Sequence, residues 1–199
     1  MIDQKKFEFI KKKYGHYASW AIWADAGKKT KDNVGDLSIF DIKNNAELLQ
    51  QLNPNIILVG LNISRGIMEV PLANFHDARS VAMDFKIRYA LNGSPFWGAY
   101  MTDIIKDFDQ KASGKVMSYL SKNKPFEKEN ARIFREEIND LGSQNPTIIA
   151  FGRDAHTILT RNFSNEYKVF KIPHYSDFSS KEKYREEVSC VFQIAAHHL

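Results

Sequence analysis

The residue of this sequence that is best placed for chemistry is Asn62, because it follows a short apolar run that ends in glycine. Residues 56–59 (IILV) are apolar and rich in β-branched side chains without alternation, and Gly60 follows them. Such a run predicts a strand buried on both faces of a parallel sheet. Open α/β sheets bind ligands at the carboxyl ends of their strands, so Asn62 is a candidate for ligand binding or catalysis. Alternatively, Gly60 and Asn62 supply only the backbone angles that the following turn needs.

Three later segments repeat this pattern of an apolar run that ends in polar residues. The runs are 99–105, 147–151 and 168–172, and their polar groups are Thr102 with Asp103, Gly152 with Arg153, and His174 with Ser176. Right-handed crossovers between parallel strands gather the carboxyl ends of those strands on one edge of the sheet. We therefore expect Asn62, Asp103 and His174 to face one cleft.

Helical patterns separate these strands. Helices are expected over residues 3–14, 44–52, 77–90 and 126–141, and after residue 179. Their expected caps are Asp77 for the third helix, Gly142 for the fourth, and a capping box of Ser179 and Glu182 for the last. Residues 106–124 lack a strong period and are expected to form a loop with at most one short helix. Strands that alternate with helices predict an α/β protein, a three-layer α/β/α sandwich with a central, mostly parallel four-stranded sheet.

Length and composition predict one globular domain. The chain has 199 residues, which we assign to a single domain, with residues 1–53 as a helical and aromatic N-terminal extension packed on it. The aromatic segment 14–23 is expected to pack on the core, although its rings would also suit base stacking. A net charge of +4 and a pI near 9.0 are only weak indications that the protein binds a polyanionic partner.

Several classes of function are disfavoured by the sequence. The single cysteine, Cys190, excludes an intramolecular disulfide and a cysteine-rich metal site, and we expect it in the core. Nucleotide-binding GxGxxG and P-loop motifs are absent, as is a GxSxG elbow. His76 and Asp77 lack a second spaced histidine, so no metal site is predicted. No apolar run has membrane-spanning length and no signal peptide is recognisable, so we expect a cytoplasmic monomer without a membrane partner.

Four segments, in this order along the chain, resemble motifs of the uracil-DNA glycosylase superfamily. Residues 60–64 (GLNIS) look like the first motif in the Gly-Ile-Asn-Pro-Gly form of the mismatch-specific uracil and thymine glycosylases. Residues 98–105 and 146–155 are similar to the family's third-strand segment and to its segment of Pro, buried strand and Gly-x-x-Ala. Residues 174–176 (HYS) look like the second motif, His-Pro-Ser. The resemblance spans roughly residues 53–184 and is that of a diverged member, since Ile63, Ser64 and Tyr175 replace the usual Pro and Gly residues of the two motifs.

The resemblance implies a DNA glycosylase that hydrolyses the N-glycosidic bond of a flipped-out uracil or other damaged base, with no cofactor and no metal. In that family's mechanism Asn62 would hold the attacking water, and His174 would donate a hydrogen bond to the departing base. The implied base-binding residues are Phe75, Asp103, Gly60 and Leu61, and a place in the hydrophobic core is the alternative for Phe75. The implied DNA-binding residues are Ser64, Arg65, Ser176, Phe178, Lys181 and Lys183.

Two other functions stay open at this point. One is a catalytically inactive protein of the same fold that binds a nucleic acid or a nucleotide. The other is a small-molecule enzyme that uses the same fold, because a fold does not determine a function. Asp103 bears on this choice, since an ionised carboxylate can accept from uracil N3–H but cannot donate to O4.

Overall fold

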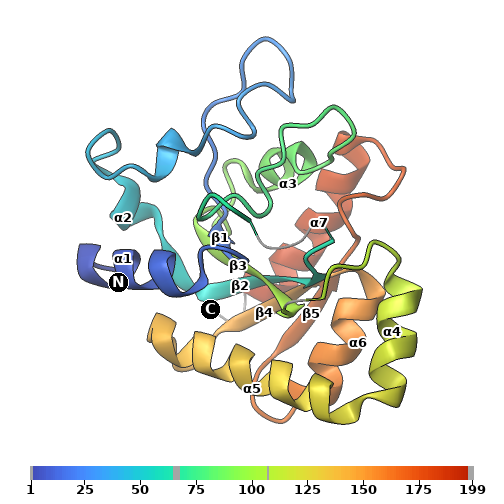
Figure 1. The fold of residues 1–199 in the computed structure, drawn as a ribbon. Coiled ribbons are helices and arrows are strands. Elements are labelled where there is room, and N and C mark those ends of the chain that lie inside the picture. Colours follow the sequence, from blue (N-terminus) through green and yellow to red (C-terminus); the bar gives the residue numbers. More distant parts are fainter. Residues whose placement is uncertain (1, 65–67, 107, 197–199) are drawn as a thin grey trace.

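A five-stranded, mostly parallel sheet forms the centre of the protein in the computed structural model, which describes residues 2–64, 68–106 and 108–196 (Figure 1). The strands of these residues are β1 (Ser19–Trp20), β2 (Asn53–Asn62), β3 (Ala99–Ile105), β4 (Thr147–Phe151) and β5 (Val169–Ile172). Their order across the sheet is β1-β3-β2-β4-β5, and β1 alone among these described strands is antiparallel to its neighbour. The predicted α/β class with a mostly parallel sheet is therefore confirmed.

Helices cover both faces of this sheet. Along β2, Ile57 and Val59 belong to the core cluster on one face, and Ile56 and Leu58 belong to the cluster on the other. The first face packs against α1 (Gln4–Tyr14), α4 (Ser113–Lys122), α5 (Lys124–Leu141) and α6 (Gly152–Phe163). The second face packs against α3 (Phe85–Leu91) and α7 (Lys181–Ala196). Burial on both faces explains why β2, β3 and β4 contain continuous apolar runs rather than alternating ones, whereas the edge strand β5 is only partly buried.

The predicted number of four strands is wrong, because the aromatic N-terminal segment contributes the fifth. Strand β1 pairs with β3, and Trp20 lies opposite Tyr100 with their ring centroids 5.0 Å apart. Two residues are too few to show a strand period, so the sequence pattern could not predict this strand. Burial of Trp20 confirms that the segment packs on the core.

Helix α1 attaches the start of the chain to α5. Asp3 is its N-cap and accepts a hydrogen bond from the Lys6 N–H at 2.7 Å. The Lys6 Nζ donates to the Asp140 backbone oxygen at 2.7 Å, and the Tyr14 hydroxyl donates to Asp140 Oδ2 at 2.6 Å. Both predicted helices are thus confirmed, as is the C-cap of α5 at Gly142, whose φ of 77° lies in the left-handed region that favours glycine.

The helix predicted over residues 77–90 is shorter than expected. It begins at Phe85, and residues 77–84 form turns and irregular backbone instead. Asp77 is not an N-cap, because its carboxylate accepts hydrogen bonds from the Arg79 backbone and guanidinium. Val81, which fitted the apolar face of the predicted helix, is 76% exposed. The agreement of Val81 with a helical period was therefore coincidental.

The last helix begins with a different cap from the predicted one. The Lys183 N–H donates to Ser180 Oγ at 3.2 Å. Ser180, and not the predicted Ser179, therefore caps the first turn of α7. Cys190 was expected in the core but is exposed on this helix. The helix predicted over residues 44–52 is limited to α2 (Leu48–Gln51), and a 3-10 helix that was not predicted, η1 (Leu37–Phe40), precedes it. The short helix allowed for residues 106–124 is α4.

A buried ion pair joins β3 to α5 directly beside the strand end. Lys106 Nζ lies 2.8 Å from Glu137 Oε2, and both side chains are almost completely buried. The same ammonium donates to Thr102 Oγ1 at 2.5 Å, and the Tyr100 hydroxyl donates to Glu137 Oε1 at 2.6 Å. These bonds satisfy the charges inside the core, where an unpaired charge would be costly.

We expect Glu137→Ala to lower the free energy of unfolding by about 3–5 kcal/mol, because it leaves the Lys106 charge buried without a partner. Urea denaturation at neutral pH measures this loss. Glu136→Ala is the matched control, since its carboxylate pairs with Lys13 at the surface, and we expect a much smaller loss. Equal losses for the two variants would contradict this assignment.

Candidate functional site

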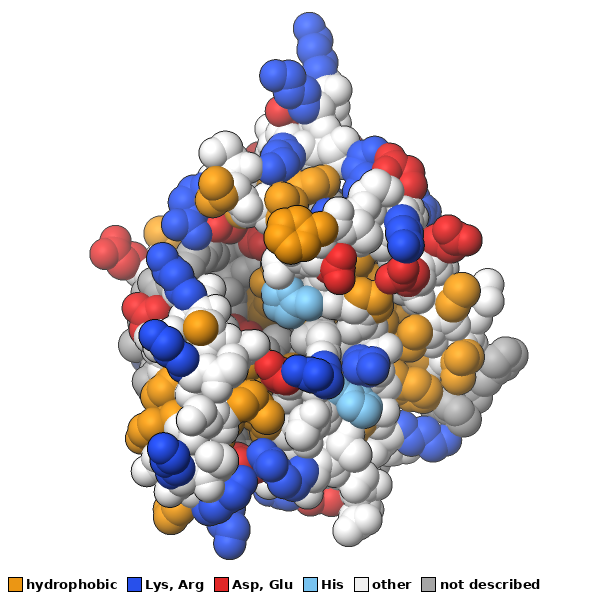
Figure 2. Space-filling model, turned by 90° about the vertical axis from the view of Figure 1, so that its right-hand side faces the viewer, with side chains coloured by type: hydrophobic (Ala, Val, Ile, Leu, Met, Phe, Trp, Pro, Cys, Tyr) orange, Lys and Arg blue, Asp and Glu red, His pale blue; other side chains and the backbone are white. Residues whose placement is uncertain are grey.

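A cavity of about 660 Å³ opens at the carboxyl ends of the parallel strands. Figure 2 shows this face of the molecule, with a hollow beside a histidine side chain and with Lys and Arg side chains around it. The predicted site residues that line the cavity are Gly60, Leu61, Asn62, Ser64, Phe75, Asp103, His174 and Ser176. The convergence expected from the strand order is therefore present.

The other predicted residues lie outside this cavity. Phe178 and Lys181 line a second cavity of about 520 Å³, which shares Met83 and Ser176 with the first. Lys183 lies further along α7, with its Nζ 3.9 Å from a carboxylate oxygen of Glu187. Arg65 falls outside the described residues. The two described lysines that were implied for DNA contact, Lys181 and Lys183, therefore do not line the first cavity.

Asn62 is the last residue of β2, and hydrogen bonds to two backbone carbonyl groups hold its side-chain amide nitrogen in place. Nδ2 donates to the carbonyl oxygens of Phe108 and Gln110 at 2.8 and 2.9 Å. These bonds hold the loop between β3 and α4 over the strand end. Because both amide hydrogens are used, Oδ1 is the group of this side chain that can accept a further hydrogen bond, for example from a water molecule.

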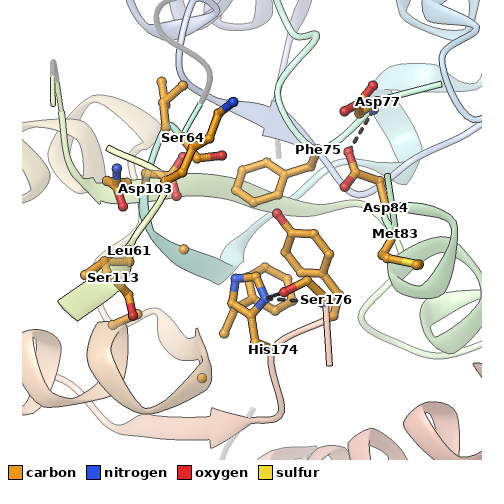
Figure 3. Close-up of a pocket in the computed structure, with 18 of the residues that line it drawn as sticks. Leu61, Ser64, Phe75, Asp77, Met83, Asp84, Asp103, Ser113, His174 and Ser176 are labelled. Carbon is orange, nitrogen blue, oxygen red and sulfur yellow. Dashed lines mark hydrogen bonds between the residues drawn. The ribbon is translucent and has the colours of Figure 1, made fainter. Parts of the chain in front are cut away.

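His174 is held in one orientation by Ser176. The Ser176 backbone N–H donates to His174 Nδ1 at 3.2 Å, and the Ser176 Oγ lies 2.8 Å from the same nitrogen (Figure 3). A backbone N–H can only donate, so Nδ1 accepts and the proton of the neutral ring is on Nε2. Burial lowers the pKa of His174, and the nearby Asp177 opposes this effect. The ring is therefore a neutral hydrogen-bond donor at neutral pH.

Glycine at position 152 allows α6 to start against this histidine. Its φ of 83° lies in the left-handed region, and a Cβ there would lie 3.3 Å from His174 Cβ. Tyr175 stacks on His174 with ring centroids 4.5 Å apart, and it contacts Phe151 edge-on at 5.3 Å. The turn from β4 to α6 thus shapes the histidine side of the cavity.

Phe75 forms the aromatic wall of the cavity and has an unusual backbone. Its φ of 65° is left-handed, a conformation that costs a non-glycine residue about 1–3 kcal/mol. Two hydrogen bonds support it, from the Phe75 N–H to Asn74 Oδ1 at 3.2 Å and from Trp23 Nε1 to the Phe75 oxygen at 3.3 Å. This strain lies beside the polar residues of the cavity, where strained backbone is commonly found.

Asp103 is a buried carboxylate at the floor of the cavity. Asn74 Nδ2 donates to its Oδ2 at 2.9 Å, and its Oδ1 lies 2.1 Å from the position that a Cβ on Gly60 would occupy. Burial raises the pKa of Asp103 to about 6, with added repulsion from Glu137 and Asp84, while the Asn74 hydrogen bond and Lys106 oppose the rise. The carboxylate is therefore ionised, at a cost, at neutral pH.

Sequence reasoning missed Asn74, because its loop position shows no pattern that reveals its partners. Its side chain connects three segments, since Nδ2 also donates to the Tyr17 backbone oxygen at 2.9 Å. Other lining residues that the sequence had not singled out for function are Asp77, Arg79, Met83, Asp84, Lys111, Ser113, Phe151 and Asp154. The cavity thus contains charges of both signs.

The described residues contain no group of three or more His, Cys, Asp or Glu side chains that could hold a metal ion. Among the described helices, none combines the length and the apolar character needed to cross a membrane. Comparisons of the chain with protein-family models, curated proteins and solved structures found no match.

We expect Gly60→Ala to destabilise the protein by about 1–3 kcal/mol, because the new Cβ displaces the Asp103 carboxylate from Asn74. Thermal unfolding monitored by circular dichroism measures this loss. Gly114→Ala is the matched control, because a Cβ on that helical glycine meets open space and should gain up to about 1 kcal/mol. A neutral Gly60→Ala would show that the floor of the cavity is not tightly packed.

We expect Asp103→Asn to stabilise the protein at neutral pH by up to about 3 kcal/mol, since the folded pKa of about 6 exceeds the ordinary value of 3.8. The ionised carboxyl costs stability as the pH rises above 3.8, and the whole cost is present above about pH 6. The gain should therefore shrink below pH 6 and vanish near pH 3. Unfolding curves of both proteins across this range measure it, and a gain that does not depend on pH would contradict the assignment.

Proposed function

We propose that this protein is a diverged DNA glycosylase of the uracil-DNA glycosylase superfamily, which hydrolyses the N-glycosidic bond of a flipped-out damaged base. The observation that carries the proposal is that Asn62, Asp103 and His174 line one cavity together with Phe75. These residues come from the ends of β2 and β3 and from the segment after β5. Helices on both faces of the sheet are compatible with the three-layer sandwich of that superfamily.

The roles of these residues follow from their hydrogen bonds. Asn62 Oδ1 holds a water that attacks C1′ of the nucleotide, and this water releases its proton to solvent. The bond from C1′ to the base breaks, and the base departs with the electron pair. His174 Nε2–H donates to an acceptor atom of the base as negative charge grows there, and fixed donors of this kind typically contribute about 10²–10³-fold to a rate.

Contacts to DNA would surround the cavity. Phe178 is fully exposed and lines the second cavity, which shares Met83 and Ser176 with the first, so it suits insertion into a base stack. Lys181, Lys183, Ser64, Arg65 and Ser176 would contact phosphates in this arrangement. We further propose that a single domain over residues 1–199, with residues 1–53 as its N-terminal part, acts as a cytoplasmic monomer without a metal or cofactor.

A catalytically inactive protein that binds a nucleic acid or nucleotide in the same cavity is the second candidate. The observation that favours it is the departure of both motifs at Ile63, Ser64 and Tyr175 from the glycosylase pattern. The two candidates share the cavity and differ in whether Asn62 and His174 break a bond.

We expect the protein to release a damaged base and leave an abasic site, which alkaline cleavage of a labelled oligonucleotide detects. Substrates should include single strands and duplexes with uracil, hypoxanthine, 8-oxoguanine or a G·T mismatch. Asn62→Ala and His174→Gln should each reduce the rate about 10²–10³-fold, because each removes one fixed group from the transition state.

His156→Gln is the matched control, since this histidine lies on α6 outside the cavity lining and should leave the rate unchanged. Binding of DNA without release of any base would favour the inactive protein. Base release that survives both Asn62→Ala and His174→Gln would overturn the catalytic assignment.

A further inference from the structure

The floor of the cavity is a carboxylate that its surroundings hold in one position. Asp103 is 4% exposed, and it lies opposite Gly60 in the parallel register of β2 and β3. Its Oδ1 occupies the space that the Cβ of any side chain at position 60 would fill. The Cζ atom at the tip of the Phe75 ring lies 3.5 Å from this Cβ position. Phe75 itself is 2% exposed, so a base that enters the cavity beside its ring would meet Asp103 beyond the tip of that ring (Figure 3).

The hydrogen bond from Asn74 leaves Asp103 able to accept further hydrogen bonds. The Asn74 amide has a fixed orientation, because its Oδ1 accepts from the Phe75 N–H while its Nδ2 donates to the Tyr17 oxygen. The same Nδ2 is the donor to Asp103 Oδ2, so the carboxylate is an acceptor in this bond. Each carboxylate oxygen has two lone pairs, so Oδ2 can accept a further hydrogen bond beside the one from Asn74. Oδ1, which lies against Gly60 near the tip of the Phe75 ring, is the second acceptor.

An ionised carboxylate distinguishes the edges of nucleic-acid bases by their donors. It has acceptors only, so it matches an edge with two adjacent N–H donors. Guanine presents such an edge through N1–H and N2–H₂, whereas uracil presents one donor, N3–H, beside the acceptor O4. Placing O4 against a carboxylate oxygen brings two acceptors together, and a buried site then rejects the ligand strongly.

We propose that Asp103 makes this cavity selective for a guanine-type edge, so that the bases it accepts are damaged guanines that keep N1–H and N2–H₂. The inference rests on the proposed function in that it takes the cavity as the site of the flipped-out base. A volume of about 660 Å³ is within the usual range for small-molecule sites and leaves room for a bicyclic purine. 8-Oxoguanine and 7-methylguanine both keep the two donors.

The selectivity depends on pH through Asp103. Burial is the largest influence on this carboxyl and raises its pKa to about 6. The Asn74 hydrogen bond and Lys106, directly after β3, lower the pKa, whereas Glu137 on α5 and Asp84 before α3 raise it. Above that pH the carboxylate accepts two hydrogen bonds. Below it the protonated carboxyl donates one and accepts one, as an amide does, and uracil-type edges become acceptable.

Binding can be measured separately from bond cleavage with single-stranded oligonucleotides that carry one 2′-fluoroarabino nucleotide, which resists hydrolysis. Guanine, hypoxanthine and uracil versions in an otherwise identical oligo(dT) differ only in the edge presented. Fluorescence anisotropy at pH 7.5 should show the guanine version bound at least about tenfold more tightly than the hypoxanthine version, which lacks the N2 donors. The uracil version should bind no more tightly than the hypoxanthine version.

Variants and pH then assign the preference to Asp103. Asp103→Asn should remove the preference for guanine over uracil, or reverse it, at every pH. Asp109→Asn is the matched control, because this carboxylate is exposed and lies outside the cavity lining, and it should keep the wild-type preference. In the wild type, the ratio of the affinities for the guanine and uracil oligonucleotides should become smaller as the pH falls from 7.5 to 5. His174 is present in both proteins, so its protonation cannot account for a difference in this pH dependence between wild type and Asp103→Asn.

The outcomes separate the inference from the proposed function. Equal binding of the guanine and hypoxanthine versions, tighter binding of uracil, or no saturable binding of any version would overturn the inference, even if uracil is excised. A guanine preference that Asp103→Asn abolishes supports it, even if no base is released from any substrate, in which case only the glycosidic chemistry fails. The comparison of guanine with hypoxanthine uses the wild type alone and does not depend on the folding of a variant.

Discussion

The burial of the Asp103 carboxylate constrains the segments that build this site. Gly60 lies opposite Asp103 in the sheet register, and the absence of a side chain there provides the space for Oδ1. Asn74 must donate to Oδ2, which fixes the loop before Phe75 and holds the aromatic wall in its left-handed conformation. The ion pair of Lys106 and Glu137 lies on the other side of β3 and adds charges of both signs near the carboxyl. A change at any of these positions is therefore transmitted to the floor of the cavity.

Strand register completes the site from the other half of the sheet. Phe151 at the end of β4 lies opposite Ile172 at the end of β5, so Gly152 and His174 follow the strands at the same level. The left-handed Gly152 starts α6 immediately against His174. Ser176 then fixes the imidazole through its backbone, which requires no other element. Parallel strands in register thus place residues that are more than a hundred positions apart in the chain, such as Asn62 and His174, around one cavity.

The sequence was sufficient to predict the parts of the fold that depend on continuous apolar runs. Strands β3 and β4 and the apolar run of β2 are buried on both faces, so their composition reveals them. The edge strand β5 is only partly buried, and its apolar residues still reveal it. The polar residues after these strands converge as the strand order requires. Strand β1 has two residues and no period, and it forms because Trp20 is buried against Tyr100. Asn74 lies in a loop, and its importance comes from its bonds to Tyr17 and Asp103, which are distant in sequence. Such contacts are decided by tertiary packing and leave no local pattern.

A purely structural role does not explain the carboxylate at position 103. Asn74 needs only an acceptor there, and a neutral amide would supply one without the cost of burying a charge, a cost visible in the pKa of about 6. The same cavity contains the left-handed Phe75 and an imidazole whose pKa is lowered by burial. A left-handed non-glycine residue and two titratable groups with shifted pKa values therefore lie in one cavity. Strained backbone and buried titratable groups that lie together are typical of a functional site, because each of them lowers the stability of the fold.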